Sequence, residues 1–356
     1  MERSTTASRN GFTLIELLVA MVVTLGIMAA GVQLFQQSLR TADLSVRRSE
    51  VQTEVRAALN QIERDLAQAG TGVPIGGIAI PSQATGGANP NFACDANQCY
   101  VGADVPFTQG ALYKVTPASG IGANIIEASD AIKITYVDPN LDWSAFTTTN
   151  IAANGGSVTM PAGTVPAVTD PALGIVPGDI VLLQNGVGSA VGVATAVAGN
   201  KITFGVDPLN INQPAAPAGN IPSIKIANSN PVTYPATKVS RLVMVTYFIQ
   251  QVVTPDGPDS RLMRQIGAHT PVPIAEHIED LKITYDIVDD TTGALVANLP
   301  NAVVGNPPVP KPNQIRKINI NITGRSFRAG NNPGIQRVNL STSVGPRNLS
   351  FRDRYN

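Results

Sequence analysis

The feature that most constrains this chain is an apolar run near its N-terminus. Residues 12–35 read FTLIELLVAMVVTLGIMAAGVQLF and contain one charged residue, Glu16. As a helix, this segment would be about 36 Å long, enough to cross a bilayer core of roughly 30 Å with some tilt. A secretory signal peptide has a shorter apolar region with a small-residue cleavage site after it, whereas here Gly11 comes before the run. The sequence therefore predicts a transmembrane helix over residues 12–35.

The helix is predicted to continue well beyond the apolar run, because no proline follows before Pro74. Apolar residues recur there at steps of four and three, the spacing of an amphipathic helix: Val51, Val55, Leu59, Ile62, Leu66 and Ala69. The charged residues between them are expected on the outer surface: Arg56, Glu63, Arg64 and Asp65. Gly70 and Gly72 end the pattern, which predicts one helix from about Phe12 to Ala69, roughly 85 Å long. Its second half, within residues 36–70, needs a partner surface in the same chain.

Strand patterns supply that surface. The segments expected as strands are 111–115, 130–138, 178–185, 190–199, 201–207, 238–250, 261–266, 278–289, 315–326 and 338–348. The sequence TPDGPDS between 250 and 261 is typical of a hairpin turn. In 315–326, Ile318, Ile320 and Ile322 alternate with polar residues, which predicts one buried face. An antiparallel sheet with one apolar face would cover the amphipathic half of the helix.

Composition supports this layout and limits the possible partners. Lys and Arg together number 25 and Asp and Glu together number 25, so no net basic field attracts a nucleic acid. The 32 glycines and 27 prolines favour short strands, turns and long loops over a helical bundle. We therefore expect an α+β chain with a loop- and strand-rich region over 71–237 and an antiparallel sheet over 238–356.

The two cysteines, Cys94 and Cys99, lie in the sequence CDANQC. They lack the second pair of ligands that a structural zinc site needs. The spacing favours a small disulfide loop in an oxidising compartment, with a stabilisation of about 2–3 kcal/mol or less. The alternative is a pair of free thiols in a loop.

The N-terminal residues also carry a resemblance. Gly11-Phe12-Thr13-Leu14-Ile15-Glu16, followed by the long apolar run, resembles the class III signal of type IV pilins and type II secretion pseudopilins. The resemblance implies a leader of residues 1–11 and cleavage by a prepilin peptidase between Gly11 and Phe12. It also implies methylation of the new N-terminal residue, Phe12.

The resemblance implies a role for Glu16 in subunit assembly. After cleavage, the Phe12 amine would carry a positive charge, and Glu16 of a neighbouring subunit could pair with it inside a stack of helices. An unmatched charge of this kind is costly in a low dielectric. The alternative is a tolerated charge in a plain membrane anchor, at up to about 2.5–3.5 kcal/mol for a carboxylate at the helix centre and less near one end.

The C-terminal layout resembles the large PilW-like minor pilins and, more loosely, the J-type pseudopilins. The matching parts are the hairpin over 238–266, the segment PIAEHIEDLKITYDI, the strand IRKININITGR and the ending LSTSVGPRNL. Two departures from major pilins favour a minor subunit. The apolar helix contains no proline, and the cysteine pair lies early in the chain.

Other candidate sites are weaker. Asp138, Asn140 and Asp142 begin like a calcium loop, but Trp143 and Thr149 replace the required glycine and glutamate. His277 has Glu276, Glu279 and Asp280 close in sequence, and a structural histidine is the simpler interpretation. Paired catalytic carboxylates, a nucleophile motif and a metal cluster are absent from the sequence patterns. We therefore expect no enzyme activity, no cofactor and no metal.

The leading hypothesis is a type IV pilus minor pilin that primes or caps filament assembly. It would span the inner membrane once, with its C-terminal domain in the periplasm or later at the surface pilus tip. The expected partners are the prepilin peptidase, other minor pilins, the major pilin, the inner-membrane assembly platform and membrane lipid. The alternatives are a J-type pseudopilin at the tip of a type II secretion pseudopilus, and a binding module in which 71–237 contacts a surface, a sugar or DNA.

Overall fold

The computed structural model describes residues 13–80, 91, 93–94, 99–100, 111–119, 129–212, 221–254, 257–289, 292–304, 309–310, 312–326 and 335–349. The chain divides into two compact units, Met1–Glu50 and Val51–Asn356, each described by itself. One helix, α1 (Leu14–Gln68), contributes to both units. The prediction of a single helix from about Phe12 to Ala69 is confirmed over the described residues.

In the first unit, the described residues are the N-terminal part of α1. Helix begins at Leu14, and no side chain from Thr13 to Glu50 is buried in the single chain. The segment is long and apolar enough to cross a membrane. This agrees with the transmembrane helix predicted over 12–35.

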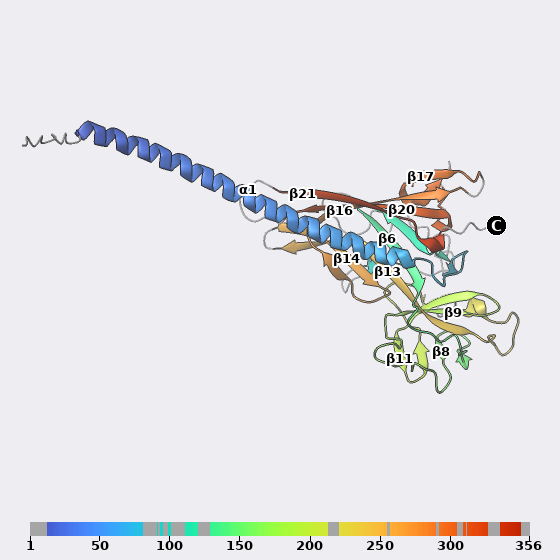
Figure 1. The fold of residues 1–356 in the computed structure, drawn as a ribbon. Coiled ribbons are helices and arrows are strands. Elements are labelled where there is room, and N and C mark those ends of the chain that lie inside the picture. Colours follow the sequence, from blue (N-terminus) through green and yellow to red (C-terminus); the bar gives the residue numbers. More distant parts are fainter. Residues whose placement is uncertain are drawn as a thin grey trace, which may run out of the picture. The chain divides into compact units, whose positions relative to one another are not determined.

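In the second unit, the remainder of α1 packs on sheets. All six residues of the predicted apolar stripe are buried: Val51, Val55, Leu59, Ile62, Leu66 and Ala69. Figure 1 shows this part of the blue helix lying along strands of the two larger sheets described below. The expectation that Asp65 lies on the outer surface is wrong, because Asp65 is only 4% exposed. Partners on the sheet, described below, explain how a carboxylate is buried there.

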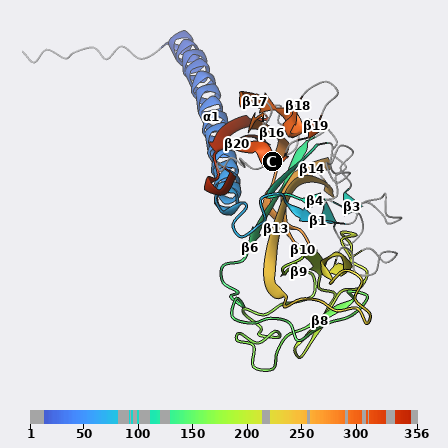
Figure 2. The same ribbon diagram turned by 90° about the vertical axis from the view of Figure 1, so that its right-hand side faces the viewer.

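A seven-stranded antiparallel sheet provides much of this surface. Its strands are β5 (Val115–Ser119), β6 (Asp130–Val137), β9 (Ile180–Gln184), β10 (Ser189–Val193), β13 (Lys238–Thr254), β14 (Gly257–Ile266) and β15 (Val272–Ala275). The order is β10-β9-β13-β14-β15, with β6 also paired to β13 and β5 to β6. The long strand β13 is central, as Figure 2 shows. The boundary expected at residue 237 falls inside this sheet, since β5, β6, β9 and β10 precede it.

The predicted hairpin is confirmed. Strands β13 and β14 pair from Val245 with Ile266 to Thr254 with Gly257. The residues that join the two strands, 255 and 256 of TPDGPDS, lie outside the described residues.

A four-stranded antiparallel sheet, in the order β17-β16-β20-β21, completes the surface under α1. Its strands are β16 (Ile278–Val288), β17 (Leu295–Leu299), β20 (Ile315–Arg325) and β21 (Arg337–Val344). Ile318, Ile320 and Ile322 are at most 1% exposed, so the predicted alternation is confirmed. Together with the stripe of α1 and one face of the seven-stranded sheet, they form one core.

The other face of the seven-stranded sheet and a smaller β-structure have cores of their own. The smaller structure is a four-stranded sheet in the order β11-β12-β8-β7, whose strands are β7 (Asn150–Ile151), β8 (Ser157–Thr159), β11 (Ala196–Ala198) and β12 (Lys201–Thr203). Trp143 is buried in its core. The single strand predicted over 190–199 is wrong, because β10 and β11 divide it between two sheets.

The described residues contain further short elements. The short strands are β1 (Ile78–Ala79), β2 (Ala93–Cys94), β3 (Cys99–Tyr100), β4 (Ala111–Leu112), β18 (Val303–Val304) and β19 (Val309–Pro310). The short 3-10 helices are η3 (Ile221–Ile224), η4 (Pro300–Ala302), η5 (Pro312–Gln314) and η6 (Arg347–Leu349). One long helix with several antiparallel sheets is the α+β layout that the sequence predicts.

Candidate functional site

The N-terminal end of α1 is held by reciprocal hydrogen bonds between Thr13 and Glu16. The Thr13 backbone N–H donates to Glu16 Oε2 at 2.9 Å, and the Glu16 backbone N–H donates to Thr13 Oγ1 at 3.3 Å. The Thr13 hydroxyl also donates to Glu16 Oε2 at 3.0 Å. This is a capping box, which satisfies backbone N–H groups that the first helical turn leaves without partners. In the single chain, therefore, Glu16 serves its own helix.

The Thr-x-x-Glu spacing is the sequence signal of this box. Neither the charge of Glu16 in an apolar run nor its expected pairing with a Phe12 amine indicated Thr13 as a partner. A carboxylate in the first turn is also favoured by the helix dipole. Gly11 and Phe12 lie outside the described residues, so their roles in cleavage and methylation stay predictions.

The surface that follows Glu16 is apolar all round. Each large apolar side chain from Leu14 to Phe35 is more than half exposed in the single chain. Such an area is far larger than a soluble monomer normally exposes, and it marks a membrane or protein contact. The segment from Leu14 to Phe35 thus offers one carboxylate, Glu16, within a continuous apolar surface.

Comparisons with known proteins address this segment. The family model of the prokaryotic N-terminal methylation motif matches residues 6–32. This N-terminal segment is pilin-like. The match covers Gly11, Phe12 and Glu16 together with most of the apolar run, and it indicates a membrane-anchored, single-pass protein. No curated protein and no solved structure matches the chain.

The second unit contains a buried ionic cluster on α1. Arg264 Nε donates to Asp65 Oδ2 at 2.9 Å, and the Tyr247 hydroxyl donates to the same oxygen. Burial raises the pKa of Tyr247, and the negative charge of Asp65 adds to the rise. The cluster links the helix to β13 and β14. A sequence signal existed, since Asp65 lies three residues after Ile62 and next to Leu66, within the apolar stripe.

The two cysteines lie on neighbouring strands. Cys94 on β2 is directly opposite Cys99 on β3. Cys94 is disulfide-bonded, and its pairing with Cys99 stays a prediction. The oxidising compartment that such a bond implies stays a prediction.

The other sequence candidates have partners inside the protein. Asp138 accepts a hydrogen bond from Arg241 Nε at 2.8 Å, and Asp142 accepts one from the Ser144 backbone N–H at 2.9 Å. His277 Nδ1 lies 2.8 Å from Asp259 Oδ2, a residue far from it in sequence. Its sequence neighbours Glu276 and Glu279 instead pair with arginines of other strands, Arg261 and Arg337. Among the described residues, no group of three or more His, Cys, Asp or Glu side chains is placed to hold a metal ion.

Proposed function

We propose that this chain is a minor pilin, a non-catalytic subunit that primes or caps the assembly of a type IV pilus. The observation that carries the proposal is the methylation motif at 6–32 joined to a helix whose apolar surface holds one carboxylate, Glu16. A plain membrane anchor needs the apolar surface and would use the carboxylate only to cap its own helix. A subunit of a helical stack uses both.

The proposed mechanism depends on two charges that appear at different times. Removal of the leader by a prepilin peptidase creates an amine on Phe12, and the Glu16 carboxylate of a neighbouring subunit pairs with it. The bilayer-like interior of the stack has a low dielectric, in which an unmatched charge is strongly disfavoured. The pairing therefore selects subunits that carry both groups and sets their register along the stack.

The minor role rests on two departures from the major pilins. The apolar helix contains no proline, and the cysteine pair lies early in the chain, within the second unit. The chain would sit in the inner membrane with this unit in the periplasm, where a Cys94–Cys99 disulfide persists. Its partners would be other minor pilins, the major pilin, the assembly platform and membrane lipid. A pseudopilin of type II secretion would use the same N-terminal chemistry with a different set of partners.

The test is co-purification of partner pilins with Glu16→Leu in the native host. Leaving the neighbour's amine without its carboxylate typically costs about 3–5 kcal/mol, so partner recovery should fall by at least tenfold. The variant should still be cleaved and accumulate normally, because the second unit does not include Glu16.

Two matched variants separate pairing from other effects. Thr13→Val removes the hydroxyl of the capping box at about 0.5–2 kcal/mol but keeps the carboxylate, so it should retain most partner binding. Glu50→Leu makes the same substitution at an exposed position of the same helix and should behave as wild type. Normal partner recovery with Glu16→Leu would contradict the subunit role. Recovery of secretion components in place of pilins would identify a pseudopilin.

A further inference from the structure

The outer strand β21 is a long and regular edge of the sheets under α1. It has eight residues, contains no proline, and pairs with β20 along its whole length without a shift of register. Such a strand leaves a row of backbone N–H and C=O groups able to pair with another chain. Natural proteins usually block a row of this kind, so an open one needs an explanation.

The other outer strands of the two sheets under α1 are each blocked. Strand β5 contains Pro117, and β15 contains Pro273 and a shift of register against β14. Proline has no N–H to offer to an added strand. Strand β17 has only five residues and pairs irregularly with β16. On β10, the side chain of Asn212 occupies both the N–H and the C=O of Val193, each at 2.7 Å.

The ladder shows which backbone groups of β21 face outward. The Ile283 N–H donates to Asp130 Oδ2 at 2.7 Å and is therefore not bonded to Ile320, the residue opposite it on β20. Because directions alternate along a strand, Ile320 bonds instead to Thr342, its opposite residue on β21. Three residues thus point their N–H and C=O groups away from β20: Asn339, Ser341 and Ser343. Within the described residues, these backbone groups have no hydrogen-bond partner.

The two faces of β21 define what an added strand must present. On one face, Val338 is buried, and Leu340 and Val344 are partly buried against the core that α1 covers. The helix reaches this edge, since the Thr342 hydroxyl donates to Glu63. The opposite face carries exposed polar side chains: Asn339, Ser341 and Ser343. An added strand therefore needs apolar residues on one face, to cover the rim of this core, and polar residues on the other.

A second copy of the chain in the same membrane does not supply this strand. Pairing of β21 with itself is isologous, and its two-fold axis is normal to the sheet. This axis reverses the direction of α1, which lies on the sheet, so the two helices could not enter one membrane from the same side. Copies in the same orientation would have to offer β21 a different outer strand, and those are blocked.

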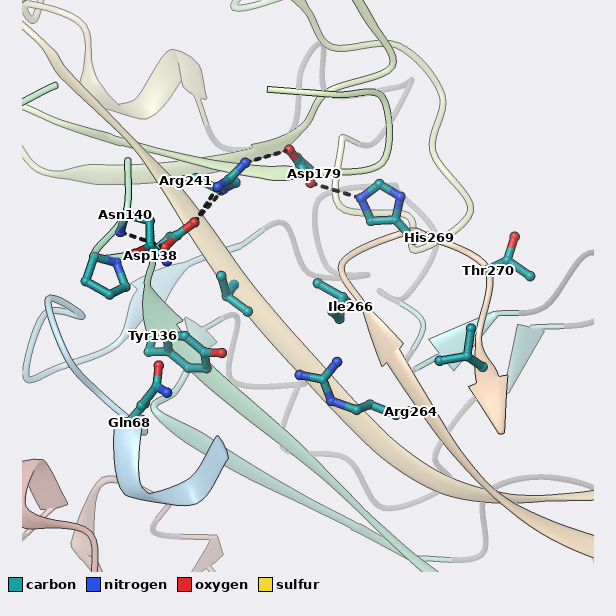
Figure 3. Close-up of a pocket in the computed structure, with 13 residues that line it drawn as sticks. Gln68, Tyr136, Asp138, Asn140, Asp179, Arg241, Arg264, Ile266, His269 and Thr270 are labelled. Carbon is teal, nitrogen blue, oxygen red and sulfur yellow. Dashed lines mark hydrogen bonds and ion pairs between the residues drawn. The ribbon is translucent and has the colours of Figure 1, made fainter. Parts of the chain in front are cut away.

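The cleft beside the end of α1 gives no comparable indication of a partner. It has a volume of about 820 Å³, and Figure 3 shows its acidic side chains paired inside the chain. Asp138 accepts a hydrogen bond from Arg241 at 2.8 Å, and Asp179 Oδ1 lies 2.9 Å from His269 Nε2. The lining mixes these groups with apolar residues such as Val243, so it specifies neither a charged nor an apolar occupant.

We propose that β21 binds an extended strand of a different pilin in the same membrane, which pairs with the outward backbone groups of Asn339, Ser341 and Ser343. A strand is favoured over a lipid or a small molecule because the free donors and acceptors repeat every two residues along one line. An extended backbone matches that repeat. This inference rests on the proposed function, since it assumes that the chain assembles with other pilins.

The first experiment measures binding of the purified full-length chain, in detergent, to each other chain of the same organism that carries the methylation motif. Ser341→Pro removes an outward N–H and keeps those that bond β20, so it should weaken binding of one partner at least tenfold. Asn339→Pro makes the same change at a second position. Ser341→Ala is the matched control, because it keeps the N–H, and it should bind as wild type. An unchanged unfolding midpoint of either proline variant excludes a folding effect.

Hydrogen exchange of the wild type tests the same contact without a substitution. Partner binding should slow exchange of the outward amides of Asn339, Ser341 and Ser343 at least tenfold. The amides of Leu340 and Thr342 already bond β20 and should change less. A partner that docks on a face of the sheet would not produce this alternation.

Three outcomes would overturn the proposal. They are failure of every partner to bind the wild type, unchanged exchange of the outward amides in a complex that the folded proline variants also form, and a complex of two copies of this chain that Ser341→Pro dissociates. The failures can be told apart. If Glu16→Leu abolishes partner recovery while the outward amides stay unprotected in the wild-type complex, only the β21 proposal fails. If Glu16→Leu recovers partners normally, the subunit role fails, whatever the exchange of β21.

Discussion

At the scale of single residues, Glu16 has one set of partners in the single chain and another in the proposed stack. In the single chain its carboxylate accepts hydrogen bonds from the backbone and hydroxyl of Thr13. These bonds reduce the penalty of holding a carboxylate in an apolar segment before assembly. In the proposed stack the same carboxylate meets a neighbour's amine. Because both arrangements use the N-terminal face of one helical turn, the change requires little movement of the backbone.

Lys133 is a second notable residue, because its burial disfavours the charged form of its side chain. It lies on β6, is 1% exposed, and faces Thr116 and Thr246 in register on the neighbouring strands. Burial lowers the pKa of Lys133 from 10.5 to about 7. The unfolded chain therefore binds a proton that the folded chain does not between these two pH values. The free energy of unfolding should rise with pH across this window and should lose that gain as pH falls toward 7.

Lys133→Met tests this expectation, because it keeps the length of the side chain and removes the titrating amine. The wild type should gain stability relative to Lys133→Met when the pH rises from about 7 to about 9, measured by denaturant unfolding in detergent. The difference arises from one group, so other titrations cancel between the two proteins. Parallel pH profiles for the two proteins would show that Lys133 keeps its proton when folded.

At the scale of elements, the sequence predicts which apolar residues of α1 pack on the sheets but not which charged residue is buried with them. Spacing alone identified the buried stripe from Val51 to Ala69, because a helix that must cover a sheet needs apolar residues at steps of three and four. Spacing could not identify Asp65 as buried, since its burial depends on Tyr247 and Arg264, which lie about 180 to 200 residues away in sequence. The cluster fixes the helix at one rotation and one register.

Asp65→Ala should therefore be strongly destabilising. It leaves Arg264 without its carboxylate in a mostly buried position, which typically costs about 3–5 kcal/mol. Because the Arg264 side chain is 17% exposed, the loss should fall toward the lower end of that range. Glu50→Ala is the control on the same helix and should change stability by no more than about 0.5 kcal/mol. Equal unfolding midpoints for the two variants would show that the cluster contributes nothing to the docking of α1.

At the scale of the whole molecule, short sequence patterns predicted the elements that depend only on neighbouring residues. The turn sequence between β13 and β14 and the alternation in β20 each specify an element within a few residues. The pairing of β13 with both β6 and β9 was not predictable, since it joins segments more than 50 residues apart whose apolar patterns permit several registers. For the same reason, the sequence identifies Glu16 but not the contacts of Asp65 with Tyr247 and Arg264.

The proposed pairing of Glu16 also depends on cleavage of the leader, because Phe12 has a free, charged amine only after the leader is removed. A bulky residue at Gly11, as in Gly11→Leu, should block the close approach of a peptidase and leave the precursor at full length. The central claim is thus tested most directly by the mass of the N-terminal peptide of protein purified from native membranes. We predict a chain that begins at Phe12 and carries one added methyl group on its amine, and an unprocessed chain in Gly11→Leu. A wild-type chain that retains residues 1–11 in native membranes would contradict the account. So would a Gly11→Leu chain that begins at Phe12.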